Sequence, residues 1–438
     1  MRSGYRLTLL SGLTRLRTGT RDSQLIPGGD QHTTAIAPVA RARRPPDVAR
    51  WSALEGGRRP RGGVRAFGTL VGIRAAYWAG IAFVFMAYPY RLPAGTPHYA
   101  VFEWRTDLLF NVFARWDTVW FLRIAGDGYR TVKEAAFLPL YPLLVHVFGY
   151  VTRSPLVAGV LLSLAAGGVA AVVLSKIARP LIGERGARDV ILYVALFPLS
   201  FVFTAVYSEG LFLALSAAAF LAALRDRPWL AGIAGALAVA TRLVGIALLP
   251  ALAVLIWNRR RSVVAFAPLL LLPAALGLVA GYFQWRLGDA GVLFSSQHHF
   301  FGRELATLGP LGGVWDATST GVSGAVDALR TGDALGTLNA LYLLLLVAAL
   351  ALTWIAWRAL GPAFGIYSLA YLAVVVSAPG KNLPLVSLPR FLLADFPLFL
   401  ALAMLTLDRP RERQIVMCAF AAIGALAAFG FARNAWIA

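Results

Sequence analysis

Long apolar segments recur along this sequence and set the strongest limit on how the chain can fold. A helix needs about 20 residues to cross roughly 30 Å of hydrocarbon. Several runs approach or reach that length, and the chain is 58% hydrophobic and only 14% charged. We therefore predict an all-α, polytopic membrane protein. The predicted spans are residues 67–88, 155–177, 189–206, 210–224, 263–284, 335–357, 362–378, 391–407 and 414–431.

The apolar segment 229–257 is too long for one ordinary span and short for two, and Arg242 interrupts it. Two short helices that meet near Thr241 and Arg242 would bring the total to about eleven transmembrane helices. One long, tilted helix would give ten.

The formal net charge of +20 raises the question of a nucleic acid partner, so the position of the basic residues matters. Residues 1–66 hold thirteen arginines against four acidic residues. This segment has no helical or strand periodicity, which is typical of disorder. We predict a basic cytoplasmic tail over 1–66 near anionic membrane lipids, a transmembrane domain over 67–438, and no nucleic acid partner.

The predicted turns on the same side as this tail are basic, which fits the tendency of cytoplasmic loops to carry Lys and Arg. This pattern supports the hairpin at 229–257, because a single crossing there would move residues 259–261 to the other face. The resulting topology places the long intervals 89–154 and 286–334 outside the cytoplasm. The basic residues of the predicted cytoplasmic turns are Lys176, Arg179, Arg185, Arg188, Arg225, Arg227, Arg259, Arg260, Arg261, Arg358, Arg409, Arg411 and Arg413.

The stretch "RWDTVWFLRIAGDGYR" at 115–130 is the most unusual part of the first outer interval. On a helix, Asp117 would share one apolar face with Phe110, Phe113, Phe121 and Ile124. A carboxylate in such a stripe at the membrane surface is costly unless it is paired, caps a helix or takes part in chemistry. Two plain structural roles stay open: Asp117 could cap a helix that begins at Thr118, or pair with Arg123.

Several segments resemble the PIG-V family, the group of GPI mannosyltransferase 2 and its bacterial relatives. The resemblance rests on "RWDTVWFLRIAGDGY" followed by "AAFLPLYPLLVHVFG" at 135–149, and on "FTAVYSEGLFLALSAAAF" at 203–220. Weaker matches are "ATRLVGIALLP" at 240–250, "SLPRFLLADFPLF" at 387–399 and the terminal "FARNAWIA". Together they extend in order over roughly residues 67–438.

The resemblance implies a GT-C glycosyltransferase that takes a sugar from a polyprenyl-phosphate donor, such as polyprenyl-phosphate-mannose, on the extracytoplasmic face. In that fold the first outer loop carries the acidic catalytic residue, and Asp117 occupies the matching position. An attacking hydroxyl must lose a proton, so Asp117 is the expected general base. We expect inversion at the anomeric carbon. We also expect no metal or other cofactor, because the lipid phosphate is already a good leaving group.

Basic residues near the predicted outer face are candidates for binding the donor phosphate. Arg242 lies deep in an apolar region and either binds phosphate or pairs with Glu209 or Asp117. Arg390 and Lys381 lie in the last outer loop, where phosphate contact competes with simple anchoring at the interface. The five candidates are Arg115, Arg123, Arg242, Lys381 and Arg390.

The remaining candidates are substrate-binding residues, each with a plainer alternative. Glu209 either binds sugar hydroxyls or is a helix-start acid favoured by the helix dipole. Trp116 and Trp120 either stack on a sugar or anchor the chain at the interface. His299, beside His298, is either a substrate contact or solvated. Asp107 is a possible second acid of the site. Alternatively, Asp107 or Asp127 forms an ion pair with Arg115 or Arg123.

The sequence thus predicts a multi-pass cell-membrane glycosyltransferase, mannosyltransferase-like, with its active site outside and its N-terminus in the cytoplasm. The acceptor would be an extracytoplasmic glycan, lipid or protein. The alternative is a polytopic transporter or flippase of lipid-linked sugars. Such proteins usually show repeated halves and break their helices at the membrane midplane, whereas here the acids gather in outer loops and no internal repeat stands out.

Overall fold

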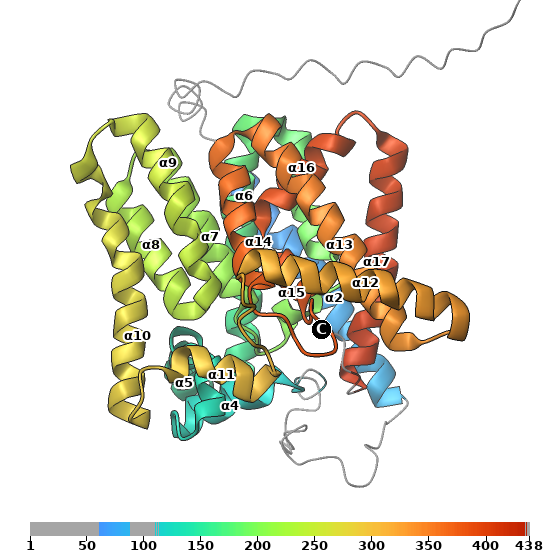
Figure 1. The fold of residues 1–438 in the computed structure, drawn as a ribbon. Coiled ribbons are helices and arrows are strands. Elements are labelled where there is room, and N and C mark those ends of the chain that lie inside the picture. The colour runs from blue at the N-terminus through green and yellow to red at the C-terminus, as the bar shows by residue number, and fades with distance from the viewer. Residues whose placement is uncertain (1–60, 88–109, 111, 113, 434, 436–438) are drawn as a thin grey trace, which may run out of the picture. The chain divides into compact units, whose positions relative to one another are not determined.

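The computed structural model describes residues 61–87, 110, 112, 114–433 and 435, and these residues form helices (Figure 1). The described residues contain no β-strand, only an isolated antiparallel bridge between Arg303 and Gly380. Helices satisfy their backbone hydrogen bonds within one segment, which a chain surrounded by hydrocarbon requires. The prediction of an all-α protein is confirmed.

The helices are bounded as follows. They are α2 (Arg61–Ala87), α4 (Asp117–Asp127), α5 (Leu140–Thr152), α6 (Pro155–Leu196), α7 (Glu209–Leu224), α8 (Pro228–Thr241), α9 (Leu248–Arg260), α10 (Leu271–Leu287), α11 (Val292–Phe301), α12 (Pro310–Thr331), α13 (Ala334–Ile355), α14 (Pro362–Val376), α15 (Leu388–Ala394), α16 (Phe396–Thr406) and α17 (Pro410–Ala432). Short 3-10 helices cover Val132–Ala136, Ser200–Thr204, Leu243–Ala247 and Val263–Leu270, and Ala356–Leu360 forms a π-helical turn.

Six of the described helical segments are long and apolar enough to cross a membrane, or seven if the bent pair α15 and α16 is one span. The chain is therefore a multi-pass membrane protein. Four further apolar helices, α5, α7, α8 and α14, are shorter than an ordinary span. The number of about eleven transmembrane helices stays a prediction.

The segment 229–257 forms two helices, as predicted, rather than one. Helix α8 ends at Thr241, and Arg242 is extended with φ −150° and ψ 135°. The far ends of the pair meet, because Nε of Arg260 at the end of α9 lies 2.8 Å from Oδ1 of Asp226 just before α8. The two helices are therefore a hairpin with Arg242 at its tip.

Three other predicted boundaries differ from the structure. The predicted spans 155–177 and 189–206 belong in part to one element, α6, which is kinked where Gly183 adopts φ +76°. The predicted span 391–407 is broken at Asp395, where α15 and α16 meet at 78°. Helix α2 begins at Arg61, before the predicted start of the domain at residue 67.

Helix α6 packs against α2, α5, α7, α16 and α17. Small residues bring these helices close together, as is common in membranes. A Cβ atom on Gly210 would lie 2.8 Å from the carbonyl oxygen of Ser163, so the first turn of α7 lies directly on α6. This contact fixes the backbone beside Glu209, which is buried.

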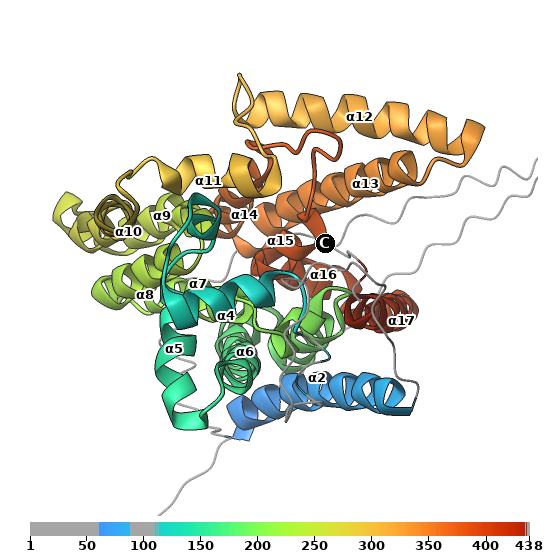
Figure 2. The ribbon, with the colours of Figure 1, turned by 90° about the horizontal axis from the view of Figure 1, so that it is seen from below.

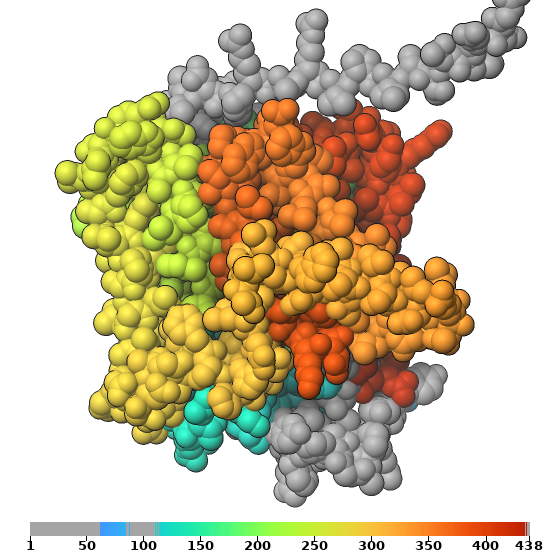
Figure 3. Space-filling view, in the orientation of Figure 1, coloured from blue at the N-terminus to red at the C-terminus, as the bar shows by residue number. Residues whose placement is uncertain are grey.

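Helices α4, α5 and α11 gather at one end of the bundle of long helices (Figures 1 and 2). Helix α12 packs along the outer side of α13, and α11 and α12 form much of the lower part of the face seen in Figure 3. The predicted outer interval 286–334 is therefore mainly helical. The polar site described next lies where α4 meets the bundle.

Candidate active site

Asp117 is the first residue of α4, and it lies at a break in the chain rather than within a longer helix. Trp116 precedes it with φ +53°, which ends helical continuity towards Phe110. The predicted apolar face that begins at Phe110 is therefore wrong in that part, although Phe121 and Ile124 are buried as expected. Asp117 does not act as the N-cap residue, because α4 begins at Asp117 itself.

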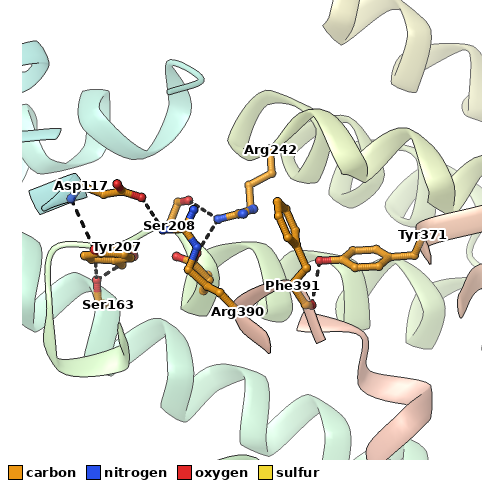
Figure 4. A network of polar contacts seen from close by, with 9 residues as sticks. Asp117, Ser163, Tyr207, Ser208, Arg242, Tyr371, Arg390 and Phe391 are labelled. Atoms are coloured by element: carbon orange, nitrogen blue, oxygen red, sulfur yellow. Dashed lines mark hydrogen bonds and ion pairs between the residues drawn. The ribbon is translucent and has the colours of Figure 1, made fainter. Parts of the chain in front are cut away.

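Arg390 joins Asp117 to Glu209 through one guanidinium group (Figure 4). Its Nη1 lies 2.5 Å from Oδ2 of Asp117, and its Nε lies 3.2 Å from Oε1 of Glu209. The Arg390 side chain is 8% exposed and the Glu209 side chain 1%. Burial on this scale excludes simple anchoring of Arg390 at the membrane interface. The structural partner of Asp117 is thus Arg390 and not Arg123, whose side chain is exposed.

Arg242, at the tip of the α8–α9 hairpin, binds the same glutamate. Its Nη1 lies 2.7 Å from Oε1 of Glu209 and donates to the hydroxyl of Ser208 at 3.3 Å. Of the two roles left open for Arg242, the structure shows the pairing with Glu209, and phosphate binding stays a prediction. One carboxylate oxygen of Glu209 therefore holds two arginines, one from α15 and one from the hairpin.

Tyr207 forms the floor of the cluster. Its hydroxyl accepts a hydrogen bond from the backbone N–H of Asp117 at 3.4 Å, and the Arg390 guanidinium lies 5.7 Å from the centre of its ring. The carbonyl of Tyr207 accepts from the hydroxyl of Ser163 on α6 at 2.9 Å. Burial, followed by the charge of Asp117, holds the pKa of Tyr207 well above its ordinary value, so its hydroxyl keeps its proton.

Arg303 is a third arginine of the site, and the sequence analysis did not single it out. It lies on the segment between α11 and α12, is 8% exposed, and donates from Nη2 to the carbonyl of Val386 at 2.7 Å. Its guanidinium lies 5.2 Å from the ring centres of both Phe301 and Phe391. The only sequence signal was an arginine directly after an aromatic pair and Gly302 in an outer interval.

These side chains line a pocket of about 130 Å³. Three arginines, the Asp117 carboxylate and the Ser208 hydroxyl contribute its polar wall. Aromatic and aliphatic side chains complete it. The lining residues are Asp117, Phe121, Ala136, Phe137, Leu138, Ser208, Thr241, Arg242, Leu243, Val244, Gln297, Phe301, Arg303, Val374, Val375, Ala378, Arg390 and Phe391.

A second, larger hollow of about 650 Å³ adjoins this pocket and is almost wholly apolar. It lies between α4, α5, α8 and α10. Residues that are adjacent in the chain line the two hollows at two places: Ala240 lines the groove and Thr241 the pocket, and Pro139 lines the groove and Leu138 the pocket. A ligand with a charged head and a long apolar tail fits this arrangement.

Other predicted site residues lie outside the pocket. Lys381, His299 and Arg123 are exposed, and the His299 ring is bonded to the carbonyl of Ser295 at 2.8 Å. Arg115 is buried beside the site without lining it, and burial lowers its pKa to about 10. Asp107 lies outside the described residues.

The two predicted tryptophans serve as packing residues in this structure. The Trp120 ring stacks on Phe137 at 6.3 Å and meets Phe300 edge-on at 5.0 Å. The Trp116 indole N–H donates to the carbonyl of Ala435 at 3.2 Å. Phe137 lines the pocket, so Trp120 supports its wall from behind.

Within the part of the chain that the structure describes, no group of three or more His, Cys, Asp and Glu side chains is placed to hold a metal ion. The expectation that no metal or other cofactor takes part stays a prediction. It rests on the chemistry of the expected donor.

The fold and the site together define a multi-pass α-helical membrane protein with a buried cluster of arginines and acids beside an apolar groove. Residues 94–259 match the model of the family described as "Mannosyltransferase (PIG-V)", which confirms the resemblance over that range. Asp117, Glu209 and Arg242 lie inside the matched range. Arg303 and Arg390 lie outside it. The match points to a glycosyltransferase.

Two solved structures are similar to this chain, both of ArnT from Cupriavidus metallidurans. The one bound to undecaprenyl phosphate has 15% sequence identity and a TM-score of 0.48, and the alignment covers 84% of this chain and 76% of ArnT. The apo structure has 15% identity and a TM-score of 0.46, with 84% and 75% covered. Among curated proteins, none matches the chain significantly.

Proposed function

We propose that this protein is a GT-C glycosyltransferase that moves a sugar, mannose by family resemblance, from a polyprenyl-phosphate donor to an extracytoplasmic acceptor with inversion. One observation carries the proposal. Asp117 lies in a pocket with three arginines, and that pocket adjoins an apolar groove. The family match over 94–259 supports glycosyl transfer as the reaction.

Asp117 acts as the general base in this mechanism. The acceptor hydroxyl attacks the anomeric carbon as its proton passes to the Asp117 carboxylate, and the bond from that carbon to the phosphate oxygen breaks. Because attack and departure occur on opposite faces of the carbon, the configuration inverts. Arg242 and Arg390 lie in the same pocket and stabilise the growing charge on the leaving phosphate.

The apolar groove provides a place for the donor's polyprenyl tail. Its walls, from α4, α5, α8 and α10, are made mainly of Ala, Leu, Pro and Val side chains. Binding of the tail there would bring the phosphate to Arg242, since Ala240 at the groove and Arg242 at the pocket are two residues apart. The apolar lining of the groove therefore supports a donor that is anchored in the membrane.

Sugar transfer from radiolabelled polyprenyl-phosphate-mannose in membranes tests the proposal, with wild type, Asp117→Asn and the exposed-site control Asp327→Asn. Transfer by the wild type and the control, and its loss in an equally well inserted Asp117→Asn variant, is expected. Equal transfer by Asp117→Asn would remove Asp117 as base. Parallel donors that carry glucose or arabinose identify the sugar, and no transfer from any of them would contradict the enzyme class.

A further inference from the structure

The charged residues of the pocket do not balance. Arg242, Arg303 and Arg390 carry three positive charges, and Asp117 and Glu209 carry two negative charges. The ion pairs described above use Arg242 and Arg390 and leave Arg303. Among the described residues, no carboxylate forms an ion pair with Arg303, and its Nε has no hydrogen-bond partner although the side chain is buried.

Arg303 lines the pocket and is buried, and contacts of the backbone and the side chain hold it there. The bridge between Arg303 and Gly380 fixes its backbone, and the N–H of Glu304 donates to the carbonyl of Pro379 at 3.3 Å. Its guanidinium also lies 5.2 Å from the ring centres of both Phe301 and Phe391. A buried cation without an anion costs free energy, so its retention here indicates a ligand that supplies the missing charge.

The environment of Arg303 is electrostatically unfavourable in this state. Burial, followed by the charges of Arg390 and Arg242, lowers its pKa to about 9, and only the charge of Asp117 acts in the other direction. The guanidinium still carries its proton at neutral pH. An anion bound between these three arginines would relieve their mutual repulsion.

The charge on the donor matches this excess at each stage of the reaction. A sugar linked to polyprenyl phosphate is a phosphodiester with one negative charge, so the loaded pocket is neutral. When the anomeric C–O bond breaks, the leaving polyprenyl phosphate carries two negative charges, because the second pKa of a phosphate monoester is about 6. The acceptor proton has by then neutralised Asp117, so three arginines face Glu209 and a dianion, and the pocket is neutral again.

We infer that Arg303 is a phosphate-binding residue of this site, and that its charge keeps the pocket neutral before and after sugar transfer. This inference rests on the proposed function. It assigns to the α11–α12 segment, which lies outside the range of the family match, a direct role in holding the donor. The part of the guanidinium that lines the pocket supplies the contact, while Nη2 stays on Val386.

A purely structural role for Arg303 is the competing explanation. In that case the side chain would only tie the segment between α11 and α12 to Val386 and fill the space between Phe301 and Phe391. The two explanations differ for Arg303→Lys, which keeps the positive charge and loses the guanidinium contact with Val386.

The test measures binding of polyprenyl monophosphate, and of polyprenol of the same length, to the full-length protein purified in detergent. The variants are Arg303→Gln, Arg303→Met and Arg303→Lys, with the exposed Arg330→Gln as control. Arg303→Met is included because it keeps the space between the two rings filled if the Gln variant accumulates poorly. Melting temperatures report on folding.

We expect the Gln and Met variants to bind the monophosphate roughly tenfold to a hundredfold more weakly, the range for a lost hydrogen bond to a charged group. Polyprenol binding should not change, and Arg303→Lys should keep most of the affinity. Unchanged affinity in the Gln and Met variants, or an equal loss in Lys and Gln, would overturn the assignment. If the wild type itself binds the monophosphate no more tightly than polyprenol, both this assignment and the proposed function are contradicted.

Discussion

Arg390 Nη1 lies 2.5 Å from Asp117 Oδ2, although 273 positions separate the two residues in the chain. The same guanidinium reaches Glu209 on α7. The start of α4, the start of α7 and the C-terminal quarter of the chain therefore meet at one side chain. A donor phosphate that binds the Arg390 guanidinium competes for it with the carboxylate of Asp117, the expected base.

Arg390→Gln should abolish sugar transfer and lower stability. Removal of one partner from a buried ion pair leaves an uncompensated charge, which typically costs about 3 to 5 kcal/mol. Two carboxylates lose a partner here, so a lower melting temperature is expected in detergent, with the exposed Arg411→Gln unaffected. Glu209 keeps Arg242 in this variant, so the unpaired charge is that of Asp117. Addition of Asp117→Asn to Arg390→Gln removes that charge and should restore part of the lost stability. No recovery in the double variant would contradict the coupling.

Glu209→Gln should raise affinity for polyprenyl monophosphate while it slows turnover. The change removes one negative charge from the cluster but keeps an oxygen that accepts a hydrogen bond from Arg242 and lies 3.2 Å from Nε of Arg390. A dianionic product then binds a more positive site and leaves it more slowly. Binding and single-turnover measurements separate the two effects. Weaker binding of the monophosphate would instead mean that the Glu209 charge is needed to position the arginines.

Ala274→Trp should block the apolar groove and discriminate between donors by tail length. Ala274 lines the groove and is exposed, so a larger side chain projects into the hollow without a change in the core. We expect a large loss of transfer from a long polyprenyl donor and a small effect with a short-chain, soluble analogue. The control is Leu270→Trp, an exposed position outside the groove. Equal loss with both donors would place the tail elsewhere.

Cysteine labelling tests the proposed orientation. In a Cys418→Ser background, which removes the exposed native thiol, Lys381→Cys should react with an impermeant maleimide on intact cells. Arg185→Cys, on the predicted cytoplasmic side, should react only after permeabilisation. The reverse pattern would invert the topology and place the pocket on the cytoplasmic face.

Much of the fold could be predicted because the thickness of the bilayer sets the length of a membrane-spanning helix. Basic residues in the turns predict which side each turn lies on. The α8–α9 hairpin followed from the position of Arg242 in an apolar run, and the structure confirms it. The ends and breaks of helices inside the bundle were harder to predict from the sequence. The break at Asp395 and the kink at Gly183 arise from packing and backbone geometry, which hydropathy does not report.

The candidate site was predictable where a charge interrupts an apolar segment. Asp117, Glu209 and Arg242 stand out in this way, and Arg390 follows from its position among apolar neighbours. Arg303 gave no comparable signal, because its interval is polar and an arginine there is ordinary. Lys381 illustrates the opposite error: it shares a predicted loop with Arg390, yet only Arg390 turns inwards, on the first turn of α15.

The dependence of Asp117 on Arg390 also constrains how the protein is made. Synthesis of the 273 positions between them takes roughly 15 to 55 s at about 5 to 20 residues per second. During that interval the carboxylate lacks its native partner and is favourable only in contact with water or with another cation. We therefore expect helix α4 to stay at the membrane surface until α15 has been made and brings Arg390 to Asp117.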